Sequence, residues 1–223
     1  TFPSGSDQKA IAKSLGFDAI ELIAEEEYNE SNPIWRDDSV IELLSIVKQQ
    51  NMQLHSICND FIIRNSLLHS DHAKKNCKNL IDQCQKLGAS ILVLPMFGGS
   101  LLTENNASDF YPVISELCHY ANDKNILICL ETVLKADILL SFLQNIGANQ
   151  VGYVFDTGNR VSAGLDIYND VTILGDFIRH VHIKDKNKNN ENVILGTGLV
   201  NYLAVFEALS NIDYHGGYTF ETT

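Results

Sequence analysis

Four short apolar runs in the second half of the chain carry acidic residues or histidines at or near their ends: Leu127-Ile-Cys-Leu-Glu131, Val151-Gly-Tyr-Val-Phe-Asp156, His180-Val-His-Ile-Lys-Asp185 and Gly217-Tyr-Thr-Phe-Glu221. Runs of this length and composition are typical of buried β-strands. In a barrel of parallel strands the carboxyl ends of all strands converge on one axis, so residues at those ends meet. The recurrence therefore predicts one site built from consecutive barrel strands.

The residues at these strand ends form an oxygen-rich set of metal ligands: Glu131, Asp156, His182 and Glu221. Three carboxylates and one neutral imidazole suit a divalent ion, with Mn²⁺ as the first choice and Mg²⁺, Co²⁺ or Zn²⁺ as competitors. Simpler interpretations exist for single members. A lone glutamate at a strand end is usually solvated, and Asp156 before Thr157-Gly-Asn159 could only cap backbone amides. The four residues taken together favour the metal site.

The rest of the chain alternates strand-like runs with amphipathic helical stretches. Strands are expected over residues 17–23, 53–57, 91–94, 126–130, 151–155, 180–183 and 218–221. Helices are expected over residues 7–15, 39–50, 71–87, 108–123, 135–146, 171–177 and 202–209. This alternation without long strand-only blocks predicts a parallel sheet with helical crossovers.

We expect an α/β fold, a (β/α)8 TIM barrel in a single domain over residues 1–223, because such barrels commonly run to ~250 residues as one domain. Only seven strands are expected, and the chain stops directly after the last of them. In this interpretation the first strand and the last helix of a full barrel are lacking. The alternative is an open doubly wound sheet, whose site would lie at one switch point. Carboxylates at the ends of several consecutive strands favour the barrel.

Composition excludes several classes of partner. The 16 basic and 28 acidic residues give a net charge of −12, which disfavours nucleic acid as a substrate. The five cysteines lie mostly in apolar runs, where they behave as small core residues, so a reducing cytoplasmic location is expected. No apolar stretch approaches the ~20 residues needed to span a membrane, and a signal-peptide pattern is lacking. Whether the protein forms a homodimer stays open.

Six segments together resemble a known family: Gly16-Phe-Asp-Ala-Ile-Glu-Leu22, Cys129-Leu-Glu-Thr132, Phe155-Asp-Thr-Gly-Asn159, His180-Val-His-Ile-Lys-Asp185, Gly196-Thr-Gly-Leu199 and Phe220-Glu221. Their order is similar to that in the sugar-phosphate isomerase/epimerase group of xylose-isomerase-like barrels. Within that group the spacing is closest to L-ribulose-5-phosphate 3-epimerases, also described as hexulose-6-phosphate isomerases. The resemblance covers nearly the whole chain.

The resemblance implies that Glu131, Asp156, His182 and Glu221 ligate the metal, in agreement with the strand-end pattern. It further implies that Glu131 and Glu221 are the catalytic proton-transfer pair. The metal would bind a ketose carbonyl and its neighbouring hydroxyl and stabilise an enediolate after a carbon-bound proton leaves. Return of a proton to the opposite face gives an epimerase, and return to the adjacent carbon gives an isomerase.

Four residues are expected to contact the sugar or sugar phosphate: His55, Arg64, Asn159 and Lys184. Lys184 could instead pair with Glu221. Where the related epimerases carry a basic His-Arg-Arg-type segment, this chain has only Arg64 as an evident cation, so a free ketose is a serious alternative. Glu21 could line the pocket, although its acidic neighbours suggest that a solvated loop follows it. We expect His180 to be a buried, hydrogen-bonded histidine.

Three other functions are compatible with this pattern. An inosose-type dehydratase would use almost the same metal set as an epimerase. An endonuclease IV-like DNA repair enzyme would need more histidine ligands and a basic surface, which the charge of −12 disfavours. The third is a non-catalytic sugar-binding protein. The function that these observations favour is a divalent-metal-dependent epimerase or isomerase of a ketose or ketose phosphate.

Overall fold

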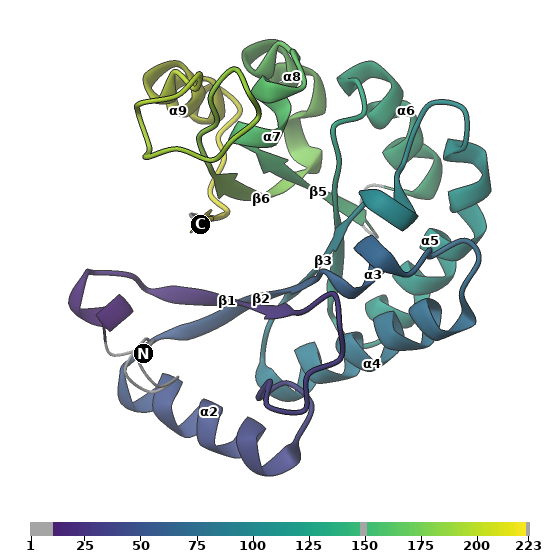
Figure 1. The fold of residues 1–223 in the computed structure, drawn as a ribbon, viewed down its shortest axis with the longest axis vertical. Helices are drawn as coiled ribbons and strands as arrows, with labels where there is room; N and C mark the ends of the chain where they lie inside the picture. Colours follow the sequence, from purple (N-terminus) through teal and green to yellow (C-terminus); the bar gives the residue numbers. More distant parts are fainter. Residues whose placement is uncertain (1–10, 148–150, 222–223) are drawn as a thin grey trace.

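The computed structural model describes residues 11–147 and 151–221 (Figure 1). Its strands are β1 (Ala19–Ala24), β2 (Gln53–Asn59), β3 (Ile91–Pro95), β4 (Leu127–Glu131), β5 (Val151–Asp156), β6 (Ile178–Ile183) and β7 (Gly217–Phe220). Its α-helices are α2 (Asp37–Gln49), α3 (Phe61–Arg64), α4 (Asp71–Leu87), α5 (Ala107–Asn122), α6 (Ala136–Ile146), α7 (Thr157–Ser162), α8 (Ile167–Leu174) and α9 (Tyr202–Asn211). Two 3₁₀ turns are η1 (Gly98–Ser100) and η2 (Gly175–Phe177).

The seven strands are all parallel and pair in sequence order from β1 to β7. They form a nearly closed barrel, and the longer helices follow one another around its outside (Figure 1). Within the described residues no pairing links β1 to β7. No helix in this part of the chain is long and apolar enough to cross a membrane.

The predicted α/β barrel and all seven predicted strands are confirmed, with small shifts at the strand ends. The helix predicted over residues 7–15 lies partly outside the described residues. The helix predicted over residues 171–177 was wrong in its bounds, because α8 begins at Ile167. Its true start follows Asp166, whose side chain accepts a hydrogen bond from the backbone N–H of Asn169 and so caps the first turn. The short helices α3 and α7 were not predicted.

Apolar residues pack in two places, as a barrel requires. A small cluster inside the barrel consists of compact side chains: Cys58, Ile91, Val93, Cys129 and Val154. The much larger cluster fills the space between the strands and the helices, and it includes Val181 and Ile183 of β6. Because side chains alternate along a strand, His180 and His182 then point into the barrel. All five cysteines are buried and free.

A buried arginine joins the segments that follow β4 and β5. Arg160 of α7 is fully buried and donates through Nε and Nη2 to Asp170 of α8, at 2.9 and 2.5 Å. Its Nη1 donates to the carbonyls of Thr132 and Leu134 and to the hydroxyl of Tyr153, at 3.2, 3.1 and 2.9 Å. These contacts fix the loop after β4 against α7, at the carboxyl ends of the strands.

Arg160→Met should lower the free energy of unfolding by about 3–5 kcal/mol, because it leaves Asp170 and the carbonyl of Leu134 buried without their donor. Urea denaturation followed by circular dichroism measures the change. Arg36→Met is the matched control, since Arg36 forms an exposed ion pair with Asp38 and its loss should change stability little. Equal effects of the two substitutions would contradict the role given to Arg160.

Candidate metal centre

The four residues of the strand-end pattern come together in the structure. Glu131 ends β4, Asp156 ends β5, His182 lies on β6 and Glu221 follows β7 directly. One ligand atom from each lies within 4.8 Å of the ligand atoms of the other three. Glu131, Asp156 and His182 are buried, and the side chain of Glu221 is 34% exposed. The group is therefore a candidate site for a divalent ion, open to solvent on the Glu221 side.

The ring of His182 lies between the carboxylates of Glu131 and Glu221 on one side and the carboxylate of Glu21 on the other. Its Nδ1 lies 3.0 Å from Oε2 of Glu221 and 3.7 Å from Oε2 of Glu131. Burial opposes protonation of the ring, but the surrounding carboxylates, that of Glu21 first, outweigh it and raise the pKa of His182 well above its usual value. Without a metal ion, His182 is thus an imidazolium that bridges carboxylates.

The two glutamates of the group have opposite shifts. Burial, together with the charges of Asp156 and Glu221, raises the pKa of Glu131 to about 8. Burial also acts on Glu221, but contacts with His182 and Lys184 outweigh it and lower the pKa of Glu221 to about 2. At neutral pH the pair therefore offers one protonated and one ionised carboxyl group.

Lys184 supplies the second cation of the site. Its Nζ lies 2.5 Å from Oε1 of Glu221 and 3.3 Å from Oδ2 of Asp156. Of the two roles expected for Lys184, the structure contains the pairing with Glu221, and contact with a substrate stays a prediction. The capping role considered for Asp156 is also present. Its Oδ1 accepts a hydrogen bond from the backbone N–H of Asn159 at 2.6 Å, which leaves Oδ2 facing the site.

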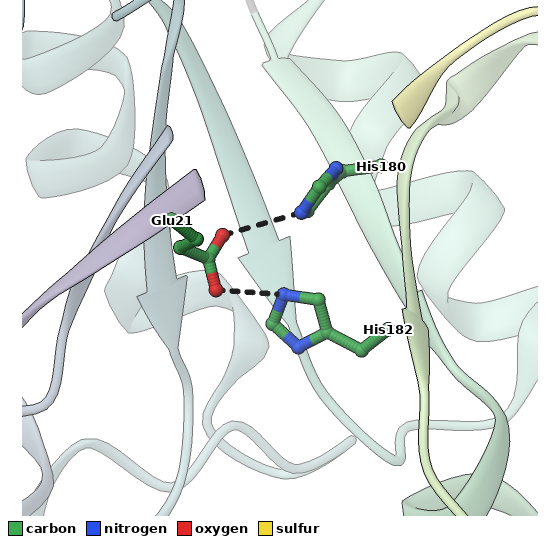
Figure 2. A group of neighbouring side chains, drawn as sticks. All are labelled: Glu21, His180 and His182. Atoms are coloured by element: carbon green, nitrogen blue, oxygen red, sulfur yellow. Dashed lines mark ion pairs between the residues drawn. The ribbon is translucent and has the colours of Figure 1, made fainter. Parts of the chain in front are cut away.

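A second cluster lies directly behind His182 (Figure 2). Glu21 projects from β1 with a side chain only 6% exposed, and its two oxygens face different histidines of β6. Oε1 lies 3.2 Å from Nε2 of His182, and Oε2 lies 3.2 Å from Nε2 of His180. Burial opposes ionisation of Glu21, but the two histidines outweigh it and lower its pKa. The expectation that His180 is buried is confirmed.

From the sequence, Glu21 had only weak support as a pocket residue, because the acidic run at Glu25, Glu26 and Glu27 suggested that a solvated loop follows it. Its place inside an alternating strand was the better signal, because the Ile20 and Leu22 side chains face the helical core and Glu21 must then face the barrel axis. The solvated stretch begins only after β1 has ended.

Of the other residues expected to bind substrate, Asn159 contacts the four-residue group directly, His55 packs beside His180, and Arg64 lies on the surface. Asn159 of α7 donates through Nδ2 to Oε1 of Glu131 at 2.8 Å. His55 of β2 packs against His180, with 5.0 Å between the centroids of the two rings. Arg64 is 60% exposed and forms ion pairs with Glu26 and Glu27. A cavity of about 440 Å³ adjoins Asn159; its lining residues are Phe97, Val133, Asn159, Ser162, Ala163, Lys186 and Asn190.

The donor set fits a divalent ion. Oδ2 of Asp156 and Nδ1 of His182 are buried on the side of the four-residue group and have no aligned hydrogen-bond partner among the described residues. Buried polar atoms normally find such partners, so atoms left without them at a carboxylate cluster are suited to an ion. Three carboxylates and one imidazole are the ligand types that Mn²⁺, Mg²⁺ and Zn²⁺ accept.

Comparison with known proteins gives the family. The family model described as xylose isomerase-like TIM barrel matches residues 10–223. An L-ribulose 3-epimerase from Methylomonas sp. (strain DH-1) is 31% identical over 147 residues, which cover 60% of this chain and 48% of that protein. The chain spans about half the length of the curated relatives it matches. That relative is named for L-ribulose and not for its phosphate, so the narrower resemblance to L-ribulose-5-phosphate 3-epimerases stays a prediction.

Two solved structures have the same fold. D-psicose 3-epimerase from Clostridium cellulolyticum H10, solved with D-tagatose, gives a TM-score of 0.79 at 18% identity and covers 99% of this chain and 80% of that chain. A xylose isomerase-like TIM barrel protein from Mycobacterium smegmatis, in complex with magnesium, gives 0.77 at 19% identity and covers 99% and 82%. At these identities the likeness shows the fold alone.

Binding of Mn²⁺ at pH 7 should release about two protons per ion, because the carboxyl group of Glu131 and the imidazolium of His182 must each lose a proton before they can ligate. Affinity should therefore rise between pH 6 and pH 8. Isothermal titration calorimetry in two buffers of different ionisation enthalpy measures the proton count. Binding without proton release would contradict the protonated state assigned to His182.

Asp156→Asn, which keeps the cap of α7 but removes a charge, should raise the Kd for the ion while leaving the free energy of unfolding nearly unchanged.

Proposed function

Because the chain belongs to the xylose isomerase-like TIM barrel family, we propose that it is a divalent-metal-dependent epimerase of an unphosphorylated ketose, with Mn²⁺ as the preferred ion. One observation carries the proposal. Glu131 and Glu221 reach the same small space from β4 and β7, which lie three strands apart around the barrel. Carboxyl groups that approach from different sides can remove a proton from one face of a carbon atom and return one to the other.

A divalent ion held by Glu131, Asp156, His182 and Glu221 would polarise the ketose carbonyl and stabilise the negative charge that develops as the carbon-bound proton leaves. The chain's own residues then move the proton. One of the two glutamates, Glu131 or Glu221, accepts it, and the other donates a proton to the opposite face. In the reverse direction the two glutamates exchange roles.

Asn159 and Lys184 contact the two glutamates and orient them. Asn159 holds Oε1 of Glu131 with a hydrogen bond, so that Oε2 faces the shared space. Lys184 neutralises Asp156 and Glu221 while no ion is bound. With Asp156 and Glu221 engaged as ligands, the ammonium group of Lys184 would be available to donate to a sugar hydroxyl, so that both roles expected for Lys184 would belong to one cycle.

The preference for an unphosphorylated sugar is supported by the cations near the barrel mouth. Arg64 is neutralised by Glu26 and Glu27, and Lys184 faces Asp156 and Glu221. Within the described residues Lys186 is the remaining cation that lines the adjacent cavity. A phosphate dianion needs charge-assisted hydrogen bonds to leave water, and these positions supply few. The curated relative named for L-ribulose supports the same substrate class.

Incubation of ketoses with the protein and Mn²⁺ in D₂O tests the reaction, because a 3-epimerase introduces deuterium at C3. Glu131→Gln and Glu221→Gln should each lower kcat by about 10²–10⁴-fold, since each removes a proton carrier. Metal content must be measured for both variants. Glu116→Gln, at an exposed ion pair with Lys78, is the control and should keep the full rate. A Glu131 or Glu221 variant with metal and full activity would exclude that residue from proton transfer.

The substrate class has its own test. An unphosphorylated ketose should give a kcat/KM at least about 10-fold higher than its phosphate ester, because one missing charge-assisted hydrogen bond corresponds to ~1.5–3 kcal/mol. Steady-state rates on matched pairs such as L-ribulose and L-ribulose 5-phosphate measure the ratio. A preference for the phosphate that disappears in Lys186→Ala would instead assign the cavity beside Asn159 to phosphate binding.

A further inference from the structure

We propose that Glu21 is a positioning residue of the metal centre: it holds His182 in the tautomer with hydrogen on Nε2, so that Nδ1 presents its lone pair to the ion. The inference rests on the metal site of the proposed function and adds to it the nitrogen that ligates and the residue that selects it.

The two nitrogens of the His182 ring face different partners. Nδ1 lies on the side of the four-residue group, 3.0 Å from Glu221 and 3.7 Å from Glu131. Nε2 lies on the other side, 3.2 Å from Oε1 of Glu21. An ionised carboxylate can only accept hydrogen bonds, whereas a neutral imidazole carries one donor and one acceptor nitrogen. With an ion held by the carboxylates on the Nδ1 side, the hydrogen of a neutral His182 is left to Nε2, where Glu21 can accept it, and Nδ1 is the ligand.

Glu21 is itself firmly held, as an orienting residue must be. Its Oε2 accepts a hydrogen bond from the hydroxyl of Ser56 at 2.5 Å and also faces Nε2 of His180. The strand register shifts between Ile20 and Glu21, so that Glu21 lies opposite Ser56. Irregularities of this kind re-aim a side chain. Because Ser56 and His180 engage Oε2, the other oxygen is left to His182 among the residues that the structure describes.

The same three residues could be interpreted as ligands of a separate ion, because their ligand atoms also lie close together. That arrangement would use Nε2 of His182 as a ligand and would place an ion on each side of one ring. The number of ions bound per chain separates the two arrangements. The positioning role requires one ion, and a second site at Glu21 requires two.

The test uses Zn²⁺, which is diamagnetic. Glu21→Leu removes the acceptor and leaves little room for a water molecule in its place, whereas Glu21→Gln is isosteric and keeps a carbonyl acceptor. Glu21→Leu should raise the Kd for Zn²⁺ by about 10–100-fold, as is usual for residues that orient a ligating histidine. Glu21→Gln should lose less affinity. Thr219→Val is the matched control, because it removes a hydroxyl that contacts the ring of His180, and it should bind Zn²⁺ as the unchanged protein does.

The ¹⁵N chemical shifts of the His182 ring provide a readout that does not change when a substitution merely lowers the stability of the fold. In the Zn²⁺-loaded protein and in Glu21→Gln they should report hydrogen on Nε2 and metal on Nδ1, and in Glu21→Leu this single pattern should be lost. Metal on Nε2, two ions per chain, or equal Kd values for Glu21→Leu and the unchanged protein would each overturn the inference and leave the proposed reaction standing. Failure of the unchanged protein to bind any divalent ion would overturn both.

Discussion

The interior of this barrel must balance a high density of buried negative charge, and the arrangement of the site follows from that requirement. Four carboxylates lie within or at the edge of one interior space: Glu21, Glu131, Asp156 and Glu221. A buried carboxylate without a partner costs several kcal/mol, so each must face a cation or bind a proton. His182 lies between Glu21 and Glu221, Lys184 lies between Asp156 and Glu221, and Glu131 is protonated at neutral pH.

The same balance makes the site suitable for a divalent ion. Lys184 already occupies a position between two of the candidate ligands, which shows that this space attracts positive charge. A doubly charged ion there satisfies more carboxylate oxygens than one ammonium group can. The cations of the chain therefore act as internal counterions that an ion, and then a substrate, can displace.

The parallel barrel explains why so few residues build the site. Each ligand needs only to end its strand, because the closure of the sheet brings the strand ends together. The supporting residues are of a different kind. Arg160 joins the loop after β4 to α7 and α8, and the cap from Asp156 starts α7 and orients Asn159 toward Glu131. The contacts of Arg160 and Asn159 support Glu131 without taking part in the chemistry.

From the sequence alone, the apolar runs determined the seven strands and their parallel arrangement, because these follow from the local pattern of residue types. The acidic residues and the histidine near the strand ends determined the four residues of the candidate metal centre, because closure of a barrel brings such ends together. Only the tertiary structure decided which charged side chains pair with one another. Glu21 meets His182 across about 160 positions of sequence, and Arg64 is neutralised by Glu26 and Glu27 almost 40 positions away. The bounds of α8 and the existence of α3 and α7 also depended on tertiary contacts and caps. Such pairings depend on which strands lie opposite each other and on small shifts of register, and a linear pattern of residue types carries neither.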